Sequence, residues 1–223
     1  MKLHVDAVMF DLDGTILDSI HIYYQIIETV FNRLDLPLPS RNKLREAAKT
    51  GDFEWGRVFP KRTPKENDRL IEKTRKIIAD IYPNLFRTQA KLIPGVKKTL
   101  EAVLQEGIKI GIVTSTPRQS MAVKLHPLVD SGVSDLMEII ITADDAPRKK
   151  PAADPLLEGS KKLGILPEHC MYVGDACTDI QAGKAAGMKT VGVLTGFDDH
   201  KALSRENPDS IIESIAQLPK IIL

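Results

Sequence analysis

Three short apolar runs, each ending abruptly in polar side chains, constrain the fold of this chain more than any other feature. The runs span residues 5–10, 108–113 and 170–173, and they end in Asp-Leu-Asp-Gly-Thr, Thr-Ser-Thr and Gly-Asp respectively. Such a run, bounded by turn residues, is typical of a strand that is buried on both faces. Weaker runs of the same kind cover 138–142, 190–194 and 210–212. We therefore expect a mostly parallel sheet.

Helical patterns lie between these apolar runs. Apolar residues recur at helical spacing in 95–106, and further helices are expected at 155–163 and 179–186. Strands that alternate with helices form βαβ units, whose helices cover the faces of a parallel sheet. The predicted fold class is α/β, with a Rossmann-like parallel sheet core and helices on both faces.

Residues 18–90 interrupt this alternation. Two amphipathic helices are expected there, at 20–34 and 67–81, with no convincing strand between them. The segments 14–18 and 83–94 are interpreted as its linkers. We therefore predict an all-helical cap domain at 18–90, inserted into an α/β catalytic core made of residues 1–17 and 91–223.

Composition excludes several classes of protein. The 223 residues carry 31 Lys and Arg against 30 Asp and Glu, a net charge of +1, so nothing in the charge balance favours nucleic acid or an anionic membrane. Two cysteines are too few for a disulfide scaffold or a zinc site. No apolar stretch approaches the ~18 residues of a membrane span, and no signal-like run opens the chain. We expect a cytoplasmic protein, either a monomer or a homodimer.

Polar side chains at the ends of the predicted strands point to the chemistry. Ligands of parallel α/β sheets bind outside the carboxyl ends of the strands, so residues that end different strands should meet there. These residues are Asp11, Asp13, Thr114, Ser115, Asp175 and Asp179, with Lys149 and Lys150 in a fourth loop. Clustered carboxylates repel one another unless a cation neutralises them, and oxygen ligands favour Mg²⁺. A lysine and a hydroxyl beside that ion would suit phosphate, and an aspartate can attack phosphorus.

Four segments of the chain then resemble the motifs of the haloacid dehalogenase superfamily of phosphatases. The resemblance rests on residues 10–19 (FDLDGTILDS), 112–114 (IVT), 150–155 (KPAADP) and 173–180 (VGDACTDI), which come in the order of that family. The matched frame spans about residues 8 to 195. The third motif departs from the family at Ala153, where proline is usual. Because a helical lid follows the first motif in this family, the resemblance also implies that 18–90 closes over the site.

The resemblance implies a role for each aspartate. Asp11 would be the nucleophile and a metal ligand. Asp13 would protonate the leaving oxygen and then activate water, with its main-chain carbonyl on the metal. Asp175 would bind Mg²⁺ directly, and Asp179 would do so through water or by orienting it.

The remaining motif residues are assigned to the substrate. Thr114 would hydrogen-bond the phosphoryl oxygens, and Lys150 would screen charge between the nucleophile and the phosphoryl group. We choose Lys150 over Lys149 because it directly precedes Pro151. Further substrate-binding candidates are Gly14 and Ser115 in the core, and Lys49 and Gly51 in a loop between the cap helices.

The expected activity is Mg²⁺-dependent hydrolysis of a small phosphorylated metabolite, in the group that resembles phosphoglycolate phosphatases. A phosphosugar mutase of the same superfamily is an alternative, although mutases often carry an acid where this chain has Gly174. A dehalogenase would not need Asp13. A binding protein with the same fold would normally have lost an acid or the lysine.

Overall fold

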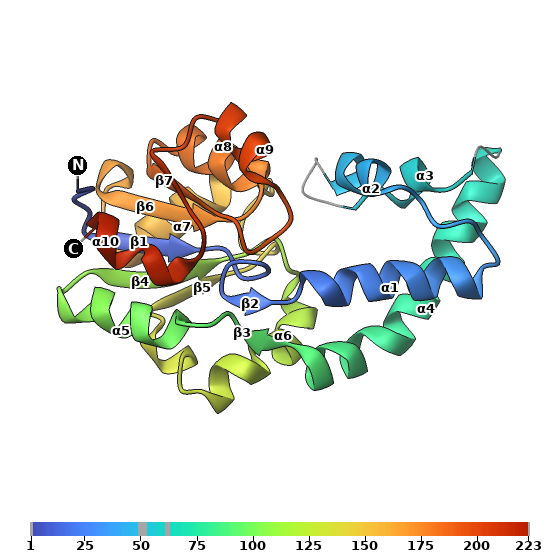
Figure 1. The fold of residues 1–223 in the computed structure, drawn as a ribbon, viewed down its shortest axis with the longest axis horizontal. Helices are drawn as coiled ribbons and strands as arrows, with labels where there is room; N and C mark the ends of the chain where they lie inside the picture. Colours follow the sequence, from blue (N-terminus) through green and yellow to red (C-terminus); the bar gives the residue numbers. More distant parts are fainter. Residues whose placement is uncertain (1, 49–52, 61–62, 223) are drawn as a thin grey trace.

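A six-stranded parallel sheet forms the centre of the molecule (Figure 1). The computed structural model describes residues 2–48, 53–60 and 63–222. The strand order is β5-β4-β1-β6-β7-β8. The strands are β1 (Ala7–Phe10), β4 (Lys109–Val113), β5 (Ile139–Ile141), β6 (Cys170–Gly174), β7 (Lys189–Val193) and β8 (Ser210–Ile212). The three strongest apolar runs are thus the three neighbouring strands at the centre.

Strand β1 shows why the sheet is covered on both faces. Its four side chains are fully buried, and they alternate between two apolar clusters. Val8 and Phe10 pack into the cluster that contains Leu100 of one helix, whereas Met9 packs into the cluster that contains Leu156 of another. Because neighbouring residues of a strand point to opposite faces, a strand that is apolar throughout needs helices on both. The predicted fold class is confirmed.

The helices of the two faces follow from these clusters. Residues of α5 (Val96–Gln105), α6 (Arg118–Asp130) and α10 (Pro219–Ile222) join one cluster, and residues of α7 (Asp154–Leu163) and α8 (Cys177–Ala185) join the other. A short helix, α9 (His200–Arg205), follows β7. The 3-10 turns are η1 (Ser134–Leu136), η2 (Pro167–His169) and η3 (Ile215–Gln217). Within the described ranges, no helix combines the length and apolar character that a membrane crossing requires.

Among the described residues of 20–89, four helices are present, and we call this segment the helical insertion. They are α1 (Ile20–Arg33), α2 (Arg41–Ala48), α3 (Trp55–Val58) and α4 (Pro64–Gln89). They share an apolar cluster of their own and extend to one side of the sheet (Figure 1). The segment enters and leaves through a two-stranded antiparallel ladder of β2 (Leu17–Asp18) and β3 (Lys91–Leu92). The division of the chain into core and cap domains at these residues stays a prediction.

Helix α4 is much longer than the sequence pattern predicts. It starts at a capping box, in which Thr63 and Glu66 exchange hydrogen bonds, and it continues through Pro83 to Gln89. The interpretation of 83–94 as a linker was therefore wrong for residues 83–89. A proline removes one main-chain hydrogen bond of a helix, and here the fully buried Phe86 anchors the following turn in the apolar cluster.

Candidate active site

Three carboxylates from separate parts of the chain converge at the carboxyl end of the central strands. Asp11 follows β1, Asp175 follows β6, and Asp179 lies in the first turn of α8. Each contributes one oxygen to a group in which all oxygens lie within 4.8 Å of one another, and all three residues are buried. The arrangement arises because β1 and β6 are paired in parallel, so that both strands end at the same edge.

Main-chain amides and one hydroxyl hold two of these carboxylates in place. The amide of Phe197 donates to Asp175 Oδ2 at 2.7 Å, and the hydroxyl of Thr15 donates to Asp175 Oδ1 at 3.2 Å. The amide of Ala176 donates to Asp179 Oδ2 at 3.0 Å. Both aspartates are therefore oriented by the loops that surround the strand ends.

Three glycines make room for these carboxylates. A Cβ atom at Gly174 would lie 2.4 Å from the side chain of Asp179, and one at Gly196 would lie 1.9 Å from Oδ2 of Asp175. Gly14 has a φ of +76°, which favours glycine, and a Cβ there would lie 2.7 Å from the same carboxylate oxygen of Asp175. The predicted substrate-binding residue Gly14 therefore lies beside Asp175.

Lys150 is the lysine that enters the site. Its ammonium is buried and donates to Asp11 Oδ1 at 2.6 Å, to Asp179 Oδ1 at 2.7 Å and to the hydroxyl of Tyr172 at 2.8 Å. Tyr172 in turn donates to the carbonyl of Val113 at 2.7 Å. All three protons of the ammonium are thus used, and one cation bridges two of the three carboxylates.

The electrostatics of the cluster leave it short of positive charge. Burial, followed by the charges of Asp179 and Asp13, raises the pKa of Asp11 to about 7, although Lys150 opposes the rise. Burial and the neighbouring aspartates raise the pKa of Asp175 well above its ordinary value. For Lys150, burial lowers the pKa, but Asp11 and Asp179 outweigh it and hold the pKa well above the usual range. Once all three carboxylates are ionised, they exceed the single ammonium by two negative charges, which one divalent cation would balance.

The side chain of Asp13 has a different set of partners. Ser19 donates to Asp13 Oδ1 at 2.7 Å, Thr116 donates to Asp13 Oδ2 at 3.3 Å, and the ammonium of Lys124 pairs with Oδ2. Among the described residues, the mutually close carboxylate oxygens belong to the other three aspartates and not to Asp13. Its expected contribution through the main-chain carbonyl stays a prediction.

The other residues assigned from the sequence lie as follows. Thr114 directly follows β4 and is buried, and its hydroxyl donates to that of Thr116 at 3.0 Å. Ser115 is the next residue and is half-buried. Lys49 and Gly51 fall outside the described residues.

Sequence reasoning missed Lys124 and Tyr172, which touch the predicted site residues directly. Lys124 lies on the buried face of α6 together with Met121 and Leu128, at helical spacing. A charged residue on an otherwise apolar helical face was a signal that could have found it. Tyr172 lies within the apolar run of β6. A buried tyrosine hydroxyl usually needs a hydrogen-bond partner, and this was a weaker signal.

The helical insertion reaches the site through two adjacent tyrosines of α1. The hydroxyl of Tyr23 accepts from Lys124 at 2.6 Å. The ring of Tyr24 stacks on that of Phe197 with 6.5 Å between centroids, and the amide of Phe197 is the one that holds Asp175. The first helix of the insertion is therefore in contact with the partners of Asp13 and of Asp175.

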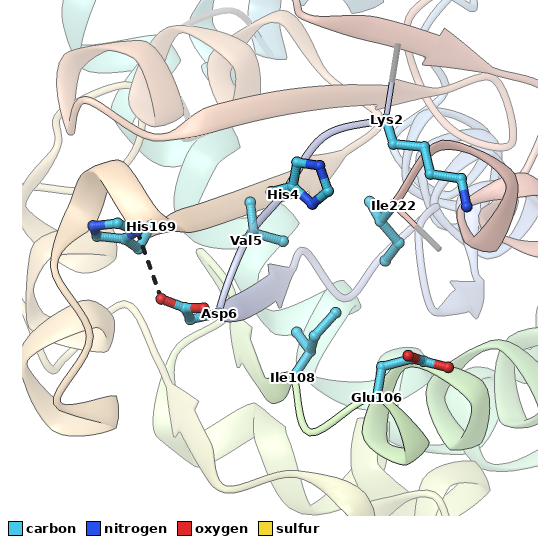
Figure 2. Close-up of a pocket in the computed structure, with 8 residues that line it drawn as sticks. All are labelled: Lys2, His4, Val5, Asp6, Glu106, Ile108, His169 and Ile222. Carbon is cyan, nitrogen blue, oxygen red and sulfur yellow. Dashed lines mark ion pairs between the residues drawn. The ribbon is translucent and has the colours of Figure 1, made fainter.

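A hollow of about 430 Å³ lies at the opposite end of the sheet (Figure 2). Several of its residues, among them Asp6, Ile108 and His169, directly precede β1, β4 and β6. Nδ1 of His169 lies 3.6 Å from Oδ2 of Asp6. A dashed line marks this pair in Figure 2. The hollow is thus at the amino ends of the strands and is separate from the carboxylate cluster.

Comparison with known proteins gives consistent matches over nearly the whole chain. A family model described as haloacid dehalogenase-like hydrolase matches residues 8–193. A phosphoglycolate phosphatase of Nitrosococcus oceani is 29% identical over 221 residues, covering 97% of this chain and 96% of that protein. A phosphoglycolate phosphatase of Escherichia coli K12 is 30% identical over 236 residues, covering 96% of this chain and 91% of that protein. The crystal structure of a predicted phosphoglycolate phosphatase from Haemophilus somnus shares the fold, with a TM-score of 0.79 at 24% identity and 97% coverage of both chains.

Proposed function

Because the chain belongs to the haloacid dehalogenase-like hydrolases, we propose that it hydrolyses a small phosphomonoester through an aspartyl-phosphate on Asp11. Family membership confirms the resemblance that the four motifs predicted. The observation that carries the proposal is the buried group of Asp11, Asp175 and Asp179, bridged by one lysine and left with an excess of negative charge.

The donor set of this group fits Mg²⁺. It offers only oxygen atoms, which a hard cation prefers, and its two uncompensated charges match a divalent ion. We propose that Asp11 and Asp175 hold the ion directly, that the main-chain carbonyl of Asp13 joins them, and that Asp179 acts through water or by orienting it. When bound, the ion would neutralise the cluster and polarise a phosphoryl oxygen.

The first step is attack by Asp11. Lys150 donates to Oδ1 of this carboxylate, so Oδ2 is the oxygen that we expect to attack phosphorus. A bond forms between Oδ2 and phosphorus, the ester P–O bond breaks, and the leaving oxygen takes a proton from Asp13. Lys150 screens the charges of the nucleophile and the phosphoryl group, while Thr114 donates to a phosphoryl oxygen.

The second step regenerates the enzyme. Water attacks phosphorus of the aspartyl-phosphate, its proton passes to Asp13, and the bond between Asp11 and phosphorus breaks. Phosphate leaves, and Asp11 is again a carboxylate. Asp13 thus acts first as acid and then as base, and it ends the cycle protonated, with a proton taken from water in place of the one that it gave to the leaving oxygen.

Hydrolysis is favoured over the mutase reaction by the packing at Gly174. A Cβ there would come within 2.4 Å of the Asp179 side chain, so an acidic residue at this position would displace a proposed metal ligand. The site is therefore built for glycine, which disfavours the phosphosugar mutase alternative.

The relatives named phosphoglycolate phosphatases support a phosphoglycolate-like substrate. We propose a small phosphorylated metabolite that binds between the core and the helical insertion, with the insertion acting as a cap that limits access of water. Neither nucleic acid nor a membrane is expected as a partner, and we expect a monomer or homodimer in the cytoplasm.

A panel of phosphate esters tests this function. Phosphoglycolate, sugar phosphates, nucleotides, pyrophosphate and an aryl phosphate would be compared by kcat/KM, with magnesium and with a chelator. We expect magnesium-dependent release of phosphate and the highest kcat/KM for a small ester. Asp11→Asn should abolish turnover, whereas Asp6→Asn, an exposed aspartate at the other end of β1, should leave it unchanged. Full activity of Asp11→Asn would refute the nucleophile assignment.

A further inference from the structure

Lys124 is a buried lysine that the hydrolytic mechanism above does not use. It lies in α6, only 2% of its surface is exposed, and its neighbours on the same face of the helix are Met121 and Leu128. The ring centroid of Phe86 lies 5.2 Å from its ammonium. Burying an ammonium in such surroundings is unfavourable unless it is paired and hydrogen-bonded.

Three acceptors satisfy this ammonium completely. They are Oδ2 of Asp13, the hydroxyl of Tyr23 at 2.6 Å and the hydroxyl of Thr116 at 2.7 Å. An ammonium has three protons, so none remains for a substrate. Lys124 is therefore placed to act on Asp13 rather than to bind the phosphate ester.

The partners of Asp13 differ in whether they can only donate a hydrogen bond or can also accept one. The hydroxyls of Ser19 and Thr116 donate here, but a hydroxyl can turn and accept instead. The ammonium of Lys124 can only donate, so the oxygen that it holds must remain an acceptor. Oδ2 of Asp13 is thus occupied by the lysine, and Oδ1 is the oxygen that can carry and release a proton.

From this geometry we infer that Lys124 is a positioning residue for Asp13, which it holds with Oδ1 as the proton-exchanging oxygen. The inference rests on the proposed function. Asp13 gives its proton to the leaving oxygen while the ester P–O bond breaks and the bond from Asp11 to phosphorus forms. Tyr23 belongs to the helical insertion, so the same lysine joins the insertion to the acid.

Dependence on the leaving group distinguishes this role from a structural one. An aryl oxygen leaves without a proton, whereas an alkyl oxygen needs the acid. The value of kcat/KM reports the steps up to the first bond cleavage. Lys124→Met keeps the aliphatic stem but removes the charge. We expect it to lower kcat/KM about 100-fold for the best alkyl phosphate and only about threefold for an aryl phosphate, since a positioned acid contributes roughly 10²–10⁴-fold.

A double-mutant cycle tests whether Lys124 works through Asp13. In the Asp13→Asn background, adding Lys124→Met should cost no more than about twofold on the alkyl ester, because the group that the lysine positions is already lost. The matched control is Lys109→Met. Lys109 starts β4 and pairs with Glu138 away from the site, and this variant should match the wild type on both esters.

The outcomes separate the inference from the proposed function. If Lys124→Met lowers kcat/KM equally for both esters, or if the two substitutions combine additively, the positioning role is wrong. If Lys124→Met does not fold, Lys124→Arg replaces it, because arginine keeps the charge with a different shape. Lys124→Arg is expected to lower the ratio of kcat/KM for the alkyl ester to that for the aryl ester at least about tenfold. An unchanged ratio would refute the inference. A wild type that hydrolyses neither ester would refute the proposed function first, and the inference with it.

Discussion

The carboxylate cluster predicts that the free energy of unfolding of the metal-free protein falls as the pH rises. The pKa of Asp11 is about 7 in the folded protein, because of burial and then its acidic neighbours, against 3.8 ordinarily. Below pH 3.8 the carboxyl is protonated in both states and contributes nothing. Between these two values the unfolded chain has released a proton that the folded chain still holds, so each increase in pH favours unfolding.

The size of this effect follows from the two pKa values. Each tenfold change in proton concentration is worth about 1.4 kcal/mol, so the interval from 3.8 to about 7 corresponds to a loss of about 4 kcal/mol. Above pH 7 the contribution of Asp11 to this loss is complete. Magnesium should offset more than half of this loss there, because a ligand that binds only the folded state adds about 2.7 kcal/mol at roughly one hundred times its Kd.

Urea denaturation across this pH range, with a chelator and with magnesium in excess, measures the free energy of unfolding. Asp11→Asn is the informative variant, because its neutral amide cannot titrate. We expect its stability in chelator to depend on pH less steeply than that of the wild type, by up to about 4 kcal/mol between pH 4 and 7. Asp6→Asn, at an exposed site, serves as the matched control. Equal slopes for wild type and Asp11→Asn in chelator would refute the reasoning.

Three further substitutions test the packing around the site. Gly174→Ala places a Cβ 2.4 Å from Asp179 and should lower kcat/KM about 10–100-fold. Gly56→Ala, which has open space around its Cβ, should leave kcat/KM unchanged, and equal activities of the two variants would contradict the close approach. Tyr172→Phe removes a buried hydroxyl with two partners and should lower the unfolding free energy by about 1–3 kcal/mol in urea denaturation, and an unchanged midpoint would argue against those bonds. Phe31→Ala empties the apolar cluster of the helical insertion and should cost about 3–5 kcal/mol by the same assay; a cost below about 1 kcal/mol would mean that this cluster is loosely packed.

The strands of this protein were readable from the sequence because their signal is local. A strand buried on both faces must be apolar throughout, so β1, β4 and β6 appear as uninterrupted runs. The full length of α4 was not readable, because Pro83 is normally a helix breaker and the burial of Phe86 in the apolar cluster of the insertion is a tertiary contact that the local sequence does not show.

The site shows the same contrast between what local sequence indicates and what depends on tertiary contacts. Asp11, Asp175 and Lys150 could be assigned from motifs, because strand ends and loops carry these residues in a fixed order along the chain. The pairing of Lys124 with Asp13 joins residues 111 positions apart, and no local pattern encodes such a contact. It exists only because α6, α1 and the loop after β1 are packed together. The sequence by itself determined the strands and the acids of the site. Tertiary packing decided which side chains orient those acids, because orientation depends on contacts between segments that only the folded chain brings together.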